Sequence, residues 1–295
     1  MRHLYECPMR WADLDLLGHV NNVVYVDYLQ EARVDLLRAA VRPVRLGELA
    51  EGVVVVRHEV SYVAPLTFSF RAVKIECWVT EIRTGSFTLA YEVFQDDPEA
   101  AEGRRVHLRA TTVLAPYVFG GEHPRRLTAE EKDALAPYLE APLERTPAIG
   151  PVPHGEAGHY PVQVRFSDVD VYGHVNNVKY FEYLQEARIW LMEKLRRAAP
   201  HPLPDLSIVV AQTDVDYRLP ILFRREPYDV WSAVTRVGNR SMTIESEICD
   251  STTVLARARV VIVFFDLETQ RSTAPPEGYR ELLAGVAAAE PRPGG

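Results

Sequence analysis

The chain has 295 residues, of which 47% are hydrophobic, and a formal net charge of −8. This length suits two ordinary domains, and the negative charge argues against nucleic acid as a partner. No apolar run reaches the roughly 20 residues of a membrane span, and the start lacks the apolar core of a signal peptide. Three scattered cysteines form neither a disulfide framework nor a metal pattern, so we expect a cytoplasmic protein.

The sequence of the first half predicts one strand, a long helix and a four-stranded meander. Apolar residues alternate in the strand at 1–12, and they recur at spacings of three and four in the helix at 20–40. The β-rich segments that follow are 53–60, 70–80, 86–95 and 106–118. Thr128 and Glu131 then form a capping box that predicts a short helix.

A proline-rich stretch separates the halves, and the second half repeats the order of the first. The predicted divisions are an N-terminal domain at 1–140, a stiff linker at 141–158 and a C-terminal domain at 159–290. The predicted elements of the second half are a strand from 159, a helix from about 176, β segments at 207–218, 228–236, 241–249 and 254–265, and a short helix after 278. We expect the tail from 287 to be disordered.

One stretch occurs twice. Residues 10–33 read RWADLDLLGHVNNVVYVDYLQEAR, residues 165–188 read RFSDVDVYGHVNNVKYFEYLQEAR, and 16 of the 24 positions are identical. The offset of 155 residues continues without a gap and pairs Tyr62 with Tyr217. The chain is therefore a tandem duplication of a whole domain.

The repeated stretch combines an acidic turn with a helix start. A carboxylate in Asp13-Leu-Asp15 can act as a base or a nucleophile. A few residues later, asparagine is a favoured N-cap, and a helix N-terminus presents free amides to an oxygen that gains negative charge. Both parts of an acyl-transfer site thus lie within about ten residues of each other, in each half.

The D-x-D-x-x-G-H-V-N-N-x-x-Y run followed by E-A-R resembles the hotdog-fold thioesterases of the 4-hydroxybenzoyl-CoA thioesterase type. It is also similar to plant acyl-ACP thioesterases, which are tandem hotdogs. The resemblance covers nearly the whole chain apart from linker and tail. It implies an α+β fold of tandem hotdog domains, each a long helix wrapped by an antiparallel sheet.

The resemblance also implies roles for particular residues. The second acid of the motif is the catalytic carboxylate of the family, at Asp15 and Asp170 here. The family's oxyanion donor is a backbone amide seven residues later, at Asn22 and Asn177. We interpret the preceding acid of each motif as a turn residue rather than a catalytic one.

Further predicted site residues are two histidines and two tyrosines. Plant members use a histidine four residues after the acid, which His19 and His174 match, and an asparagine two residues after it, which neither half has. The histidines could orient the acid, bind substrate or pack in the loop. Tyr25 and Tyr180 are predicted to be core or pocket wall, and as pocket wall they would bind substrate. Tyr62 and its matching tyrosine in the second half are likewise interpreted as core or pocket wall rather than reactive groups.

No metal and no cofactor are predicted. Asp13, Asp15 and His19 could together ligate a metal, but no further Cys or His lies nearby in sequence, so the metal-free interpretation is preferred. The chain also lacks the G-x-S-x-G motif of serine hydrolases and the glycine-rich loops of nucleotide-binding proteins.

The predicted function is hydrolysis of acyl-CoA or acyl-carrier-protein thioesters. The resemblance implies that the two halves pair within the chain, with each site at their interface, and it allows a further homodimer. Whether the carboxylate activates water or attacks to give an anhydride stays open. The alternatives are a hotdog dehydratase or hydratase and a non-catalytic acyl-binding protein.

The two predicted sites are not identical in their surroundings. Leu17 of the first copy becomes Tyr172, and Val24 becomes Lys179. In the helix, Val26 is replaced by Phe181. An aromatic ring alters a pocket by more than a methylene does, so we expect two competent sites with different acyl preferences.

Overall fold

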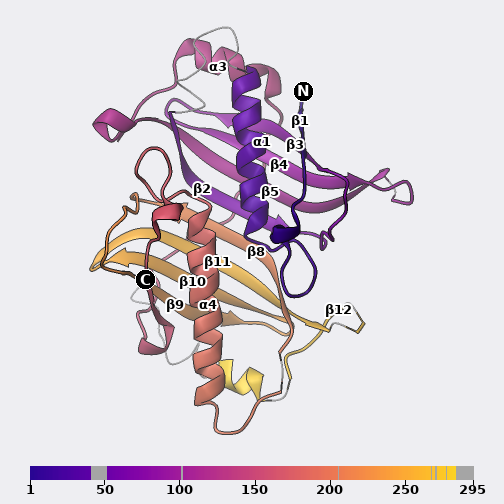
Figure 1. Cartoon of the computed structure of the whole chain (residues 1–295), viewed down its shortest axis with the longest axis vertical. Coiled ribbons are helices and arrows are strands. Elements are labelled where there is room, and N and C mark those ends of the chain that lie inside the picture. The colour runs from indigo at the N-terminus through magenta and orange to yellow at the C-terminus, as the bar shows by residue number, and fades with distance from the viewer. Residues whose placement is uncertain are drawn as a thin grey trace. The chain divides into compact units, whose positions relative to one another are not determined.

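The chain forms two compact units, Met1–Thr146 and Pro147–Gly295, as Figure 1 shows. The structure is a computed structural model, and it describes residues 1–40, 52–100, 102–204, 206–266, 268–269, 271–276 and 278–283. The boundary between the units falls inside the predicted proline-rich linker.

The N-terminal unit is one long helix on an antiparallel sheet. Its elements are β1 (His3–Cys7), α1 (Val24–Ala40), β2 (Val53–Tyr62), β3 (Val73–Ile82), β4 (Phe87–Asp96) and β5 (Arg104–Val118). The predicted elements are therefore confirmed in kind and order, with ends that shift by a few residues. A two-residue strand, β6 (His123–Pro124), pairs with the end of β5.

The predicted four-strand meander is wrong. Strands β3, β4 and β5 do follow one another in the sheet, but β2 pairs with β5 and not with β3. Strand β1 lies on the other side of β3, so the order across the unit is β1-β3-β4-β5-β2. Sequence periodicity indicates which residues are extended, but it carries no information on which strand pairs with which.

The C-terminal unit repeats this arrangement. Its elements are β7 (His159–Val162), α4 (Lys179–Ala198), β8 (Ile208–Tyr217), β9 (Tyr228–Val237), β10 (Ser241–Asp250), β11 (Thr253–Asp266) and β12 (Arg271–Ser272). The order is β7-β9-β10-β11-β8, with β12 paired to β11. Residues 279–283 form the predicted short helix, and the predicted disordered tail lies outside the described residues.

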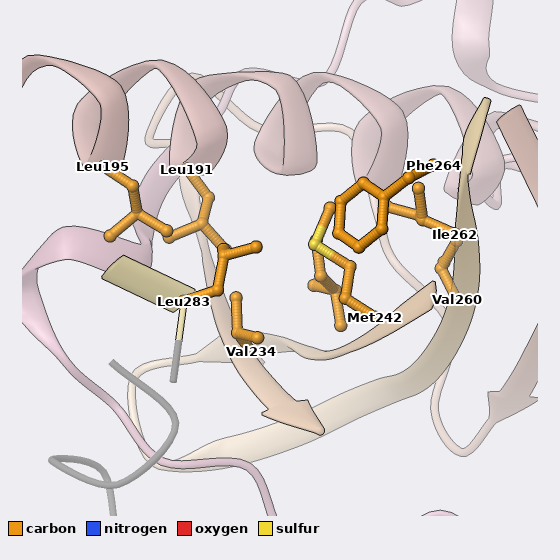
Figure 2. Close-up of a cluster of buried hydrophobic side chains, with 9 residues drawn as sticks. Leu191, Leu195, Val234, Met242, Val260, Ile262, Phe264 and Leu283 are labelled. Atoms are coloured by element: carbon orange, nitrogen blue, oxygen red, sulfur yellow. The ribbon is translucent and has the colours of Figure 1, made fainter. Parts of the chain in front are cut away.

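Helix α4 packs an apolar face against its sheet (Figure 2). Leu191 and Leu195 lie one turn apart on the helix and are 1% and 4% exposed. They join a cluster whose other members are Val234, Met242, Ile244, Val260, Ile262, Phe264 and Leu283. Each fully buried side chain of this size contributes about 1.5–3 kcal/mol, so the cluster is a large part of what holds the helix on the sheet.

The short helix α3 (Ala129–Leu135) begins with the predicted capping box. The Glu131 amide donates to Thr128 Oγ1 at 3.2 Å, and the Thr128 amide donates to Glu131 Oε2 at 2.8 Å. Arg125 adds two hydrogen bonds to the same carboxylate, at 2.6 and 2.9 Å. These bonds satisfy amides that the first helical turn leaves free.

The proline-rich segment is bonded to the sheets rather than free of them. In the N-terminal unit, Thr146 donates through Oγ1 to Glu59 at 2.8 Å and accepts from Arg57 at 2.7 Å. In the C-terminal unit, Arg259 donates to the carbonyl of Pro147 at 3.1 Å. Each part of the segment is thereby fixed on its own unit.

No helix in the described parts of the chain has the length and apolar character that a membrane span requires. The three cysteines, Cys7, Cys77 and Cys249, are buried free thiols. Burial raises the pKa of the Cys7 thiol to about 11, with nearby Asp13 and Glu31 acting in the same direction. That thiol is therefore in its neutral form at physiological pH.

Leu191→Ala should lower the free energy of unfolding by about 2–5 kcal/mol, because it removes the centre of the α4 contact and leaves a cavity. Denaturant unfolding followed by far-UV circular dichroism measures this loss. Ile189→Ala is the matched control, since Ile189 lies on the same helix and is 55% exposed. It should change stability by no more than about 0.5 kcal/mol, and equal losses in both variants would contradict this account of the core.

Candidate active site

A short closed loop connects the first strand of each unit to its helix. In the N-terminal unit the amide of Asp15 donates to the carbonyl of His19 at 2.8 Å, and Gly18 donates back to Asp15 at 3.1 Å. Gly18 has φ +74°, a conformation that is costly for residues with a Cβ. Gly173 has φ +82° at the same place in the second copy.

The carboxylate of Asp15 closes this loop from within. Its Oδ1 accepts the amides of Leu17 at 2.8 Å and His19 at 3.2 Å. Its Oδ2 has no hydrogen-bond partner among the residues that the structure describes, and the side chain is only half-buried. The acid is thus fixed in orientation while one oxygen stays available.

Asp170 has the same contacts in the C-terminal unit. Its Oδ1 accepts the amides of Tyr172 at 2.9 Å and His174 at 3.3 Å. Its other oxygen likewise meets no donor within the described part of the chain. The two halves therefore hold the predicted catalytic acids by one pattern of bonds.

Asp13, two residues before Asp15, is 3% exposed and points into the unit. Its carboxylate accepts the Arg10 amide at 2.8 Å, the Arg10 Nε at 2.9 Å and the Tyr28 hydroxyl at 2.5 Å. Burial and the bond to Asp13 raise the pKa of Tyr28. These contacts agree with the interpretation of Asp13 as a structural residue.

Asp168 repeats this buried network with Arg165 and Tyr183. The Arg165 amide donates at 2.9 Å and the Tyr183 hydroxyl at 2.6 Å. Burial alone would raise the pKa of Asp168, but the bonds from Arg165 and Tyr183 outweigh it and hold that pKa below its ordinary value. The carboxylate is therefore charged and fully engaged.

The helix start follows directly on the loop. The Asn21 amide donates to the carbonyl of Asp13 at 2.8 Å, and Asn21 Oδ1 accepts the amide of Val23 at 3.2 Å. Asn21 is therefore the capping side chain, while Asn22 contributes backbone atoms. The amide of Asn22 finds no acceptor among the described residues.

Sequence reasoning missed the role of Tyr62 and Tyr217, which it treated as core or pocket wall. The hydroxyl of Tyr62 donates to the carbonyl of Asn22 at 2.8 Å. Tyr217 donates to the carbonyl of Asn177 at 2.9 Å. The shared offset of 155 residues already marked them as an equivalent pair, but it could not show that they reach the helix start.

The histidines take part in the loop through their backbones. His19 forms an isolated antiparallel bridge with Thr67, and His174 forms one with Leu222. With the bonds to Asp15 and Asp170, these bridges fix both histidines beside the acids. A catalytic role for the imidazoles stays a prediction.

Tyr25 and Tyr180 are each 3% exposed. Tyr180 Oη accepts the amide of Ile221 at 3.1 Å, and its ring meets Tyr217 edge-on at 4.9 Å. Burial raises the pKa of Tyr25, and a bond to the backbone of Leu66 only partly offsets it. These contacts show a packing role, and the predicted contact with substrate stays a prediction.

The substitutions between the two sites fall in different surroundings. Tyr172, which replaces the exposed Leu17, is partly exposed at the loop. Lys179 Nζ lies 2.5 Å from Glu182, so its charge is paired on the first turn of α4. Phe181 is 2% exposed and belongs to the core.

His154, Glu247 and Cys249 form a group of possible metal ligands in the described part of the chain, with ligand atoms within 4.8 Å of one another. The carboxylate of Glu247 is already bonded to Arg257 at 2.7 Å and to His154 at 2.9 Å. Glu247 is therefore already engaged by an ion pair with Arg257 and a hydrogen bond with His154. Asp13, Asp15 and His19 do not form such a group, because Asp13 is engaged inside the unit.

A hollow of about 240 Å³ lies in the N-terminal unit. It is lined by Glu59, Thr80, Glu81, Arg83, Thr88, Thr111, Val113, Pro142, Leu143, Glu144 and Arg145. None of the predicted site residues is among them. The acids lie instead in loops whose tips are open, with Leu16 and Val171 fully exposed or nearly so.

Two known proteins have sequences similar to this chain, and the one with a named function is a thioesterase. The long-chain acyl-CoA thioesterase FadM of Escherichia coli is 30% identical over 128 residues, which is 41% of this chain and 93% of FadM. YsmA of Bacillus subtilis, which is uncharacterised, is 34% identical over 86 residues, covering 28% of this chain and 54% of YsmA.

Solved structures extend the similarity to both units together. A Lactobacillus plantarum protein with the provisional name oleoyl thioesterase aligns with a TM-score of 0.68 and 15% identity, covering 90% of this chain and 97% of that one. The 12:0-ACP thioesterase of Umbellularia californica aligns with a TM-score of 0.64 and 16% identity, covering 88% and 95%. At these identities the likeness concerns the fold.

The sequence profile of the thioesterase-like superfamily matches residues 9–127 and 164–283, one match in each unit. Together the two matches span most of the chain and include both loops with their acids. The chain therefore belongs to the thioesterase-like superfamily, which confirms the predicted resemblance, the tandem hotdog fold and the thioesterase class.

Proposed function

We propose that this protein hydrolyses acyl-CoA thioesters at two sites, with Asp15 and Asp170 as the catalytic carboxylates. One observation carries the assignment. In each half, two backbone amides hold one oxygen of the acid and leave the other without a partner in the described residues. A carboxylate that is fixed and yet has an available oxygen suits a base or a nucleophile.

The oxyanion of the reaction would take the amide of Asn22 or Asn177. The unbonded Asn22 amide at the helix start supports this assignment, as does the partial positive charge of that helix end. A single donor of this kind typically contributes about 10²–10³ in rate. It acts on the tetrahedral intermediate more strongly than on the substrate carbonyl.

Two chemical routes are compatible with this geometry. In the first, the carboxylate takes a proton from water, hydroxide adds to the thioester carbon, and the C–S bond breaks as the sulfur leaves and is protonated. In the second, the carboxylate adds to the carbon and expels the thiolate, and water then hydrolyses the resulting anhydride. Both routes regenerate the carboxylate and need the same oxyanion donor.

The substrate class follows from the relatives. The E. coli relative acts on long-chain acyl-CoA by its name, and the Umbellularia protein acts on a 12:0 acyl carrier protein. We extend acyl-CoA to this chain and keep the acyl carrier protein as the second candidate. Neither a dehydratase nor a non-catalytic binding protein has a particular observation in its favour.

On the family resemblance we further propose that the two halves pair within the chain, and that a homodimer can form from two chains. A cytoplasmic location stays a prediction, supported by three free thiols.

Asp15→Asn combined with Asp170→Asn should lower kcat by about 10²–10⁴, since a positioned base is lost from both sites. The asparagine oxygen can still accept the two backbone amides, so the loops should keep their shape. Thiol release from acyl-CoA measures the rate.

Asp97→Asn is the matched control for the double variant. Asp97 also accepts the amide two residues later, from Glu99 at 3.0 Å, and it belongs to neither predicted site. It should leave kcat unchanged. Wild-type kcat in the double variant, with a wild-type circular dichroism spectrum, would refute the catalytic assignment.

The two single variants, Asp15→Asn and Asp170→Asn, should retain unequal activity with different acyl preferences. Leu17 and Tyr172 differ by an aromatic ring two residues after the acid, which changes the site by more than the roughly 1–3 kcal/mol of a methylene. Values of kcat/KM across an acyl-CoA series measure this. Identical profiles would contradict divergent sites, and complete loss in one single variant would mean that only one site works.

The halves expressed separately, as residues 1–145 and 155–295, should aggregate or self-associate, because each would expose a broad apolar face. Sedimentation velocity measures their state, with the full chain as the control. Two well-behaved monomers would contradict pairing of the halves.

A further inference from the structure

The peptide unit that joins Asn22 to Val23 is held at both ends. Its carbonyl, on Asn22, accepts the hydroxyl of Tyr62 at 2.8 Å. Its amide, on Val23, donates to Asn21 Oδ1 at 3.2 Å. Because a peptide unit is planar, two bonds at opposite ends fix its rotation about the chain.

The preceding peptide unit carries the proposed oxyanion donor. It consists of the carbonyl of Asn21 and the amide of Asn22. The carbonyl accepts the amide of Val24 at 3.0 Å, inside the first turn of α1. In a trans peptide unit the N–H points away from the C=O within the same plane, so this bond and the fixed peptide that follows together set the direction of the Asn22 amide.

A tyrosine is needed because the helix itself does not satisfy the carbonyl of Asn22. The amide of Val26, four residues on, donates instead to Val23 at 3.2 Å. The Tyr62 hydroxyl comes from the end of β2, and its ring meets Tyr25 edge-on at 5.8 Å. The sheet therefore supplies a rigid donor to a carbonyl that the helix leaves free.

In the C-terminal unit, the equivalent peptide unit is held by the same two bonds, and the residues that make them have the same spacing in sequence. The hydroxyl of Tyr217, at the end of β8, donates to Asn177 at 2.9 Å, and the Val178 amide donates to Asn176 Oδ1 at 3.1 Å. Each tyrosine lies 40 residues after its asparagine. Two units with different surrounding side chains thus keep one arrangement.

We infer that Tyr62 and Tyr217 are positioning residues for thioester hydrolysis, which fix the helix-start peptides so that the amides of Asn22 and Asn177 face the developing oxyanion. The inference rests on the proposed function. Neither tyrosine touches the reacting atoms in this scheme. Each acts through the asparagine backbone, and its effect is on the transition state, because a donor that needs no reorientation stabilises the oxyanion best.

The test removes one hydroxyl at a time in a background with one working site. Tyr62→Phe is placed in the Asp170→Asn chain, and Tyr217→Phe in the Asp15→Asn chain. We expect kcat to fall about tenfold in each active background, since small misplacements of catalytic groups cost up to about 100-fold. KM should change by less than about twofold, as should the Kd of a non-hydrolysable thioether analogue of acyl-CoA, which develops no oxyanion.

The matched control is Tyr279→Phe. Its hydroxyl also donates to a backbone carbonyl, that of Pro204, at 3.0 Å, and it belongs to neither site. It should lower the melting temperature about as much as the other two and leave kcat unchanged. A positioning role predicts a kcat effect beyond this shared stability effect, whereas a purely structural role predicts none.

Two results would overturn the inference. One is an unchanged kcat in both Tyr→Phe variants, and the other is a rise in KM or analogue Kd without a fall in kcat. Failure of the proposed function is distinguishable, because it would appear first as full activity in the chain with both acids replaced. If one of the single Asp→Asn chains is inactive, the Tyr→Phe variant is measured in the other chain, since an active enzyme has at least one working site.

Discussion

The buried carboxylate of Asp13 ties the loop of the candidate site to helix α1. Its side chain accepts from Arg10 before the loop and from Tyr28 on the helix, and its carbonyl accepts the amide of Asn21 at the helix start. A single residue thereby joins three points of the chain, the furthest of which is 15 residues away from it. Loss of this carboxylate would leave the buried hydroxyl of Tyr28 unpaired, which is costly.

In the C-terminal unit, the stabilisation that the buried carboxylate of Asp168 provides depends on pH. Burial opposes ionisation of Asp168, but Arg165 and Tyr183 hold its pKa below the ordinary value. A carboxyl whose pKa is lowered in the folded state stabilises the fold above its unfolded pKa of about 3.9. That contribution is lost as the pH falls through the lower, folded value, so the loop is secure at neutral pH and weakens only in strong acid.

Position within the loop then decides which acid is available. Asp13 and Asp15 are two residues apart, yet one is 3% exposed and bonded through both oxygens, while the other is half-buried and bonded through one. The turn at Gly18 brings the amides of Leu17 and His19 to the same oxygen of the second carboxylate, so its other oxygen is left without a bond among the described residues. Two chemically equal side chains therefore differ in whether an oxygen stays available, because side-chain donors engage one of them and only backbone amides engage the other.

Much of the fold could be predicted from the sequence, because periodicity and the internal repeat are local signals. The helices at Val24–Ala40 and Lys179–Ala198 begin within a few residues of the predicted starts. The pairing of β2 with β5 could not be predicted, since nothing local in either strand encodes its neighbour. The same holds for Tyr62, whose partner lies 40 residues away.

A comparison of the two units separates structural from chemical constraints. In the network around the buried acid, the side chains that make the bonds are the same in both copies, as at Arg10, Asp13 and Tyr28. Where only a backbone amide is used, the side chain is free to change, and Leu17 becomes Tyr172 without loss of the bond to the acid.

His19 and Asn22 take part in the loop through backbone atoms, since the His19 amide donates to Asp15 and the Asn22 carbonyl accepts from Tyr62. The same residue types stand at His174 and Asn177, whose backbones make the equivalent bonds. The Asn177 side chain adds a bond of its own, because its Nδ2 donates to Oδ1 of Asn176, the side chain that caps the helix start, at 3.2 Å. The second asparagine of the repeat therefore supports the helix cap in the C-terminal unit, in addition to carrying the backbone amide that we propose as the oxyanion donor.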